Sequence, residues 1–194
     1  MSEPIRKKLE ETTLEAMMAK TTRHSDKEFL FVCPIVSQAV AASRTVDKLI
    51  EAREPACLGL VCRQIFELLI TLEYVFSIEQ SSFNDFCDYF VKNQRVGKYD
   101  RKTKAWKNAN FEYLCDKYIK SSKNDKVKGV YNALSRMSHF SLNHATETFR
   151  LDRNTLEVTL FGYREDGEKI CKAANVVQTE LVRLMTEAIK REYL

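Results

Sequence analysis

Apolar residues recur three and four positions apart in the N-terminal part of the chain, a spacing that places them on one side of an α-helix. It predicts a first helix within Met1 to Lys20, with Ser2 as a possible cap, and a second from about Phe31 to Arg53. The apolar positions of the first helix are Ile5, Leu9, Leu14 and Met17, and those of the second are Val36, Val40, Val46 and Ile50. We expect each helix to bury one side.

The segment from Ala56 to Ile78 is apolar on nearly every side, which is typical of a helix surrounded by other helices. Further helices are predicted from near Ser82, over 111–120, over 125–142 and over 170–193. Apolar and polar residues alternate over 148–161, as expected of a short β-hairpin. The pattern predicts one all-α domain over 1–194, a helical bundle with a short β-hairpin before the C-terminal helix.

The composition agrees with a globular helical protein. Apolar residues make up 44% of the 194 residues and charged residues 30%, enough for a packed core under a well-solvated surface. The chain has only five glycines and three prolines, and its six cysteines form no CxxC pair. The sequence has no signal-peptide pattern, no uninterrupted apolar stretch of about 18 residues, and no metal or nucleotide-cofactor motif. We therefore expect a cytoplasmic protein without a metal, a cofactor or a membrane partner.

Positive charge is concentrated in a basic connector, 92–108, which contains seven Lys or Arg residues and one acidic residue, Asp100. Taking seven from 31 basic residues and one from 27 acidic residues leaves 24 and 26, so this segment accounts for the net charge of +4. Clustered cations with interleaved aromatic rings suit a phosphate backbone and unpaired bases, which favours RNA over duplex DNA. The candidate RNA-binding residues are Lys98, Tyr99, Arg101, Lys102, Lys104, Trp106 and Lys107. The same pattern also fits a solvated loop.

A polar stripe interrupts the apolar central helix. Arg63, Glu67 and Tyr74 fall on one side of it, with Thr71 close by. An unpaired buried charge costs several kcal/mol, on the order of a whole domain's margin of stability, so these charges need partners. Arg63 and Glu67 can pair with each other along the helix, line a wet cleft, or meet polar groups of a neighbouring helix.

The helix predicted over 125–142 offers such polar groups. Tyr131, Ser135 and His139 recur every four residues beside its apolar stripe, and Arg136 borders them. A histidine next to a hydroxyl and a cation is suited to act as a general acid or base. The alternative is a structural histidine that only satisfies buried polar neighbours.

The segments RQIFE, Arg63 to Glu67, and YNALSRMSH, Tyr131 to His139, together resemble one branch of the HEPN superfamily (higher eukaryotes and prokaryotes nucleotide-binding domains). That branch, whose function is unknown, has an R-x3-E helix, a Y-x2-L-S-x3-H helix, a short hairpin and a closing helix. The resemblance covers the chain from about Ala56 to its C-terminus. It implies an all-helical up-and-down bundle.

The resemblance also implies a function. HEPN proteins often act in defence or toxin systems, where many cleave RNA without a metal as homodimers and others bind RNA or nucleotides without cleaving them. The catalytic residues would be His139, Arg63, Glu67, Ser135, Tyr131 and Arg136. His139 would transfer a proton, an arginine would stabilise the charged phosphorane, and the remaining residues would orient the phosphate or hold the arginine. The spacing from Arg136 to His139 differs from the arginine–histidine spacing of the family's nucleases.

A second hypothesis belongs to a different class. The polar residues of the two helices would form a structural lock in a non-catalytic helical module whose partner is another protein. In that case their loss would lower stability rather than activity, because a buried polar group left without its partner costs about 1 to 3 kcal/mol.

Overall fold

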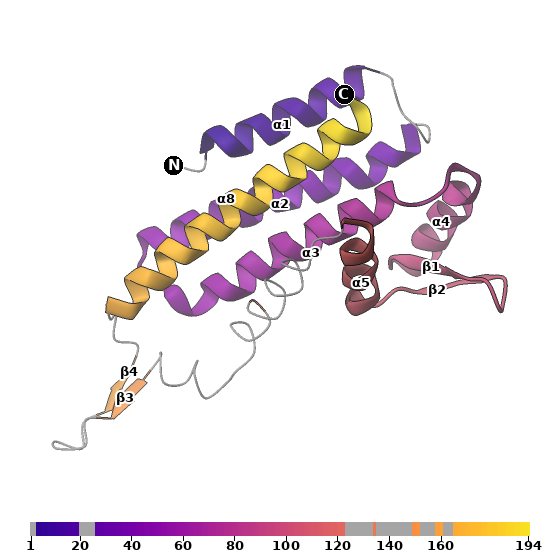
Figure 1. The fold of residues 1–194 in the computed structure, drawn as a ribbon. Coiled ribbons are helices and arrows are strands. Elements are labelled where there is room, and N and C mark those ends of the chain that lie inside the picture. Colours follow the sequence, from indigo (N-terminus) through magenta and orange to yellow (C-terminus); the bar gives the residue numbers. More distant parts are fainter. Residues whose placement is uncertain (1–2, 20–25, 123–133, 135–148, 152–157, 161–164) are drawn as a thin grey trace.

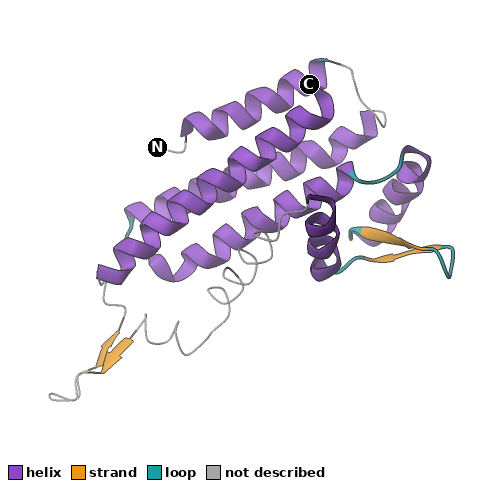
Figure 2. Ribbon diagram, in the orientation of Figure 1, coloured by secondary structure: helices purple, strands orange, loops and turns teal. Residues whose placement is uncertain are grey.

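The computed structural model describes residues 3–19, 26–122, 134, 149–151, 158–160 and 165–194. Helices dominate these residues (Figures 1 and 2). They are α1 (Glu3–Met18), α2 (Phe29–Glu51), α3 (Leu58–Phe76), α4 (Gln80–Asn93), α5 (Phe111–Ser122) and α8 (Glu165–Tyr193), with short 3-10 turns at Asp26–Glu28 and Pro55–Cys57. Two antiparallel strand pairs accompany them, β1 (Gly97–Asp100) with β2 (Ala105–Asn108) and β3 (Phe149–Leu151) with β4 (Val158–Leu160). The predicted all-α character is confirmed.

The long helices α1, α2, α3 and α8 lie side by side, and α8 packs against the other three (Figure 1). The segment that contains α4, β1, β2 and α5 lies at the C-terminal end of α3. The β3–β4 pair lies beyond the N-terminal end of α8, within the range predicted for a hairpin. The helix predicted over 125–142 lies outside the described residues, except for Leu134, which is helical and buried.

The apolar core follows the predicted spacing in three of the helices. Helix α3 is its centre, with Ile65, Leu69 and Ile70 almost inaccessible to solvent. On α2 the buried valines are Val36, Val40 and Val46, and on α8 the buried positions include Ala174, Leu181 and Ala188. A helix that removes this much apolar surface from water is held mainly by the hydrophobic effect. The core therefore fixes α2, α3 and α8 relative to one another.

Helix α2 is long and apolar enough to cross a membrane by length and composition, with a mean hydropathy of 1.5 over its most apolar window. However, 56% of that window is buried against the other helices of this domain. Such burial is typical of a core helix in a folded helical domain.

Helix α1 differs from its predicted pattern. Leu9 is fully buried, but Leu14 and Met17 are 58% and 42% exposed, so the prediction that they share the buried side is wrong. The buried side instead carries small and polar residues, Thr12, Thr13, Ala16 and above all Arg6, which is 4% exposed. The reason is that Arg6 finds polar partners on α2.

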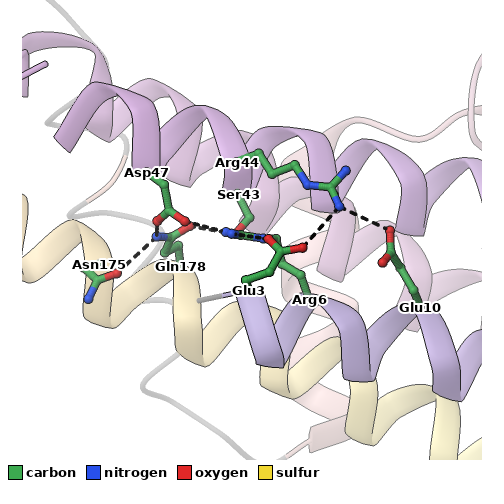
Figure 3. A network of polar contacts seen from close by, with 8 residues as sticks. All are labelled: Glu3, Arg6, Glu10, Ser43, Arg44, Asp47, Asn175 and Gln178. Atoms are coloured by element: carbon green, nitrogen blue, oxygen red, sulfur yellow. Dashed lines mark hydrogen bonds and ion pairs between the residues drawn. The ribbon is translucent and has the colours of Figure 1, made fainter. Parts of the chain in front are cut away.

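Arg6 lies in a network of hydrogen bonds and ion pairs between α1 and α2 (Figure 3). Its Nη1 donates to Ser43 Oγ at 3.0 Å and to Asp47 Oδ2 at 2.7 Å. Its Nε and Nη2 donate to Glu3 Oε2 at 2.9 and 2.6 Å. Burial works against the charge on Arg6, but the hydrogen bonds to Asp47 and Glu3 raise its pKa above the ordinary value. The guanidinium is therefore charged and held in one orientation.

Gln178 extends this network to α8. Its Oε1 accepts a hydrogen bond from Ser43 Oγ at 2.7 Å, and its Nε2 donates to Asp47 Oδ1 at 2.7 Å and to Asn175 Oδ1 at 3.2 Å. Ser43 and Gln178 are both buried. The first two helices and the last one thus share one set of polar contacts, which fixes the register of α1 on α2 and α8.

We predict that Arg6→Met destabilises the protein by about 3 kcal/mol, because it leaves the carboxylates of Glu3 and Asp47 and the hydroxyl of Ser43 without this donor. Urea unfolding followed by circular dichroism measures the change. The matched control is Lys7→Met, since Lys7 is 72% exposed and its ion pair with Glu11 spans 3.7 Å. That substitution should cost at most about 0.5 kcal/mol. Equal losses in the two variants would contradict the role given to Arg6.

Candidate nucleic-acid interface

The segment predicted as a basic connector contains a β-hairpin. Strands β1 and β2 pair in antiparallel register, with Lys98 opposite Lys107 and Tyr99 opposite Trp106. Because side chains alternate along a strand, the two aromatic residues share one side of the hairpin and the two lysines share the other. The segment is therefore ordered by strand pairing rather than extended as a connection.

The turn of the hairpin is stabilised by the side chain of Asp100. Its Oδ1 accepts hydrogen bonds from the backbone N–H groups of Lys102 at 2.9 Å and Thr103 at 3.5 Å, an arrangement typical of aspartate at turns. Its Oδ2 accepts one from Lys107 Nζ at 2.6 Å. Lys104 completes the turn with a left-handed backbone, at φ 49°. The bond from Lys107 and the backbone bonds lower the pKa of Asp100 to about 2.

The hairpin is fixed to the helices at its base. The hydroxyl of Tyr74 on α3 donates to the carbonyl oxygen of Gly97 at 2.9 Å in a buried position. Gly97 lies so close to α4 that a Cβ atom there would approach a ring carbon of Tyr89 to 2.5 Å. Only glycine permits this approach of backbone to ring. The base of the hairpin is therefore positioned by both α3 and α4.

Trp106 holds the middle of the hairpin on α4. The centroid of its ring system lies 5.6 Å from the Phe86 ring and 6.4 Å from the Tyr89 ring. Phe86 is fully buried and in turn contacts Phe31 of α2, with ring centroids 5.1 Å apart. Trp106 was predicted as an RNA-binding residue, and the structure places it in this packing role. Tyr99, in contrast, is 47% exposed.

The lysines on the other side of the hairpin have partners within the protein. Lys98 Nζ lies 4.4 Å from the centroid of the Tyr113 ring on α5, within the range of a cation–π contact. Lys107 pairs with Asp100. The remaining candidate cations, Arg101, Lys102 and Lys104, lie in the turn and are exposed. Of these candidates, the cations open to an outside ligand therefore lie in the turn.

The residues of the polar stripe on α3 have different roles. Arg63 Nε donates to Glu67 Oε1 at 2.8 Å, an ion pair within the helix whose side chains are 21% and 40% exposed. The Thr71 hydroxyl donates to the backbone oxygen of Glu67 at 2.8 Å. The Tyr74 hydroxyl donates to the carbonyl oxygen of Gly97 at the base of the hairpin. The pairing of Arg63 with Glu67 is the arrangement expected from their spacing.

The other predicted catalytic residues, Tyr131, Ser135, Arg136 and His139, lie outside the described residues. Their convergence with Arg63 stays a prediction. Within the described part of the chain, no group of three or more His, Cys, Asp or Glu side chains could hold a metal ion.

Sequence reasoning missed several residues that build the hairpin. Asp100 was counted only as the single acid of the basic segment, and Gly97 and Tyr113 were not singled out. A signal for the turn was present, because an aspartate followed by four polar residues is a common turn pattern. The contact of Lys98 with Tyr113 leaves no local signal, since it joins a strand to a later helix.

Comparisons with protein-family models, with curated proteins and with solved structures give no match for this chain. The resemblance to HEPN proteins stays a prediction based on the two helical motifs.

We predict that Asp100 titrates with a midpoint of about 2 in an NMR titration of its carboxyl group. Because the folded-state pKa lies below the ordinary 3.8, its contribution to the turn is complete above about pH 4 and is lost as the pH falls through about 2. Lys107→Met should move the midpoint back toward 3.8, because Lys107 donates the hydrogen bond that lowers it most. Lys104→Met removes a neighbouring charge of the turn and is the control. A midpoint unchanged by Lys107→Met would refute this account of the turn.

Proposed function

We propose that the protein binds RNA through the turn of the β1–β2 hairpin, within a cytoplasmic HEPN-like helical domain that forms a homodimer. The observation that carries this proposal is that Arg101, Lys102 and Lys104 lie exposed in the turn of a hairpin whose backbone is packed on α3, α4 and α5. Cations held in place by a packed scaffold lose less conformational freedom on binding than cations on a mobile loop. This argument favours a binding surface over a solvated loop.

The charges of the turn suit a phosphate backbone. An arginine and two lysines offer eleven N–H donors in all and no acceptor, which matches the acceptor-only oxygens of successive phosphates. Binding by such groups releases counterions, so its affinity falls with salt. Contacts of this kind provide affinity for RNA but no sequence specificity.

We predict that the triple variant Arg101→Gln, Lys102→Gln, Lys104→Gln weakens binding to a single-stranded RNA oligomer by at least about tenfold at low salt. The slope of log affinity against log salt should fall in magnitude by about 2, since about 0.7 of a counterion is released per contact with single strands. Fluorescence anisotropy across a salt series measures both quantities.

The matched control removes the same charge from the helices, by Lys8→Gln, Lys48→Gln and Lys190→Gln, which are all exposed. If the two triple variants bind RNA equally well, the affinity comes from net charge and the hairpin is not the binding surface.

A second candidate function is metal-independent RNA cleavage, as the HEPN resemblance implies. The pairing of Arg63 with Glu67 supports it, because a carboxylate that holds a guanidinium in one orientation prepares it to stabilise a charged phosphorane. His139 would accept the proton of the ribose 2'-hydroxyl as its oxygen attacks phosphorus. The bond from phosphorus to the 5'-oxygen would break to leave a 2',3'-cyclic phosphate, and the 5'-oxygen would take a proton from water. The alternative is a non-catalytic module that binds another protein.

We predict that the purified protein produces new fragments from total RNA in EDTA and that His139→Ala abolishes this cleavage. Circular dichroism of the variant should match the wild type, so that loss of the fold is not mistaken for loss of chemistry. Cleavage that persists in His139→Ala would remove this residue from the mechanism, and absence of cleavage by the wild type would favour the non-catalytic alternative.

A further inference from the structure

We propose that Tyr99 stacks on an unpaired base and thereby makes the hairpin selective for single-stranded RNA. This inference rests on the proposed RNA binding and assigns a specificity residue to the same surface. Of the aromatic side chains in the described helices and in the β1–β2 hairpin, Tyr99 is the exposed one, at 47%.

The orientation of the Tyr99 ring is set by its neighbour across the hairpin. The centroids of the Tyr99 and Trp106 rings lie 5.8 Å apart, with an angle of 63° between their planes. Trp106 is itself held by Phe86 and Tyr89 on α4. An aromatic ring that is fixed on one edge and open to solvent elsewhere can accept a base without first being ordered, which lowers the entropic cost of stacking.

Tyr99 also lies next to the turn cations along the hairpin. It precedes Arg101 by two residues, near the end of β1 where the turn begins. Arg101 and Lys102 begin the turn directly after Asp100. A phosphate held by these cations would therefore place an adjacent nucleotide beside the Tyr99 ring. The combination of cations and one ring is the usual means of binding single strands without sequence preference.

The choice between single and double strands follows from which surfaces a base exposes. In a duplex both faces of each base are covered by neighbouring base pairs, and no face is open to the ring. In a single strand the bases can separate and stack on an aromatic side chain. Turn cations alone would bind both forms, so the selectivity depends on Tyr99.

The test compares the wild type with Tyr99→Ala and Tyr99→Phe on three probes, namely an oligouridylate, a blunt RNA duplex and inorganic polyphosphate. We expect Tyr99→Ala to bind the oligouridylate about tenfold more weakly, the usual loss of one base stack. Tyr99→Phe should stay within about twofold of the wild type, because it keeps the ring. Affinities for the duplex and for polyphosphate should not change, since neither offers an unpaired base. An oligodeoxyuridylate should show the same loss as the oligouridylate if the ring reads the base and not the sugar.

The chain contains a single tryptophan, Trp106, so its fluorescence spectrum reports whether the hairpin is intact in each variant. Leu60→Ala, which removes another exposed apolar side chain, 58% exposed on α3, is the matched control and should bind as the wild type does. The inference is overturned if Tyr99→Ala binds the oligouridylate normally, or if it loses affinity for polyphosphate to the same extent. If the wild type binds polyphosphate and RNA alike and Tyr99→Ala has no effect, the proposed binding of RNA by the turn stands. The proposed stacking of Tyr99 on a base is then wrong. A wild type that binds no RNA overturns both proposals.

Discussion

The buried guanidinium of Arg6 sets the position of the N-terminal helix. A charge removed from water must have its donors paired, and here Glu3, Ser43 and Asp47 accept from it. Apart from Leu9, the other buried residues of α1 are small, so the hydrophobic effect alone fixes its position on its neighbours only weakly. Hydrogen bonds depend on direction and distance, and they remove that freedom. Through Gln178 the same contacts align α8, the helix that packs against all the others of the bundle.

The hairpin is held by a different kind of interaction. Rings contact one another in succession from Trp106 to Phe86 and from Phe86 to Phe31, so the hairpin is connected to the core of α2 by aromatic packing. One buried hydrogen bond, from Tyr74 to the carbonyl of Gly97, fixes its base. The cations of the turn are therefore carried on a support that extends into the bundle. This is why a short two-stranded hairpin, which is marginal in isolation, can be part of this fold.

The apolar spacing in the sequence predicted the helices that are held by apolar packing. The prediction failed where polar contacts determine which side of a helix is buried. The apolar spacing of α2, α3 and α8 is regular, and those helices lie where they were expected. In α1 the sequence favoured burial of the side with Leu14 and Met17, yet burial follows Arg6, whose partners on α2 are more than thirty residues away. The β1–β2 hairpin was missed because its strands are short and mostly polar. The ion pair of Arg63 with Glu67 was predictable because both residues lie on one helix.

The lysines that face each other across the hairpin have partners within the protein and therefore differ from the cations that can bind a ligand. Lys98 and Lys107 lie directly opposite each other, a position where like charges repel. The Tyr113 ring and the Asp100 carboxylate offset that repulsion, so the two lysines are already engaged. A solvated loop has no need of such compensation, because mobile charges move apart in water. The candidate cations that the hairpin can present to a phosphate backbone are therefore those that its own packing leaves exposed. These are Arg101, Lys102 and Lys104, in the turn that follows Tyr99 and Asp100.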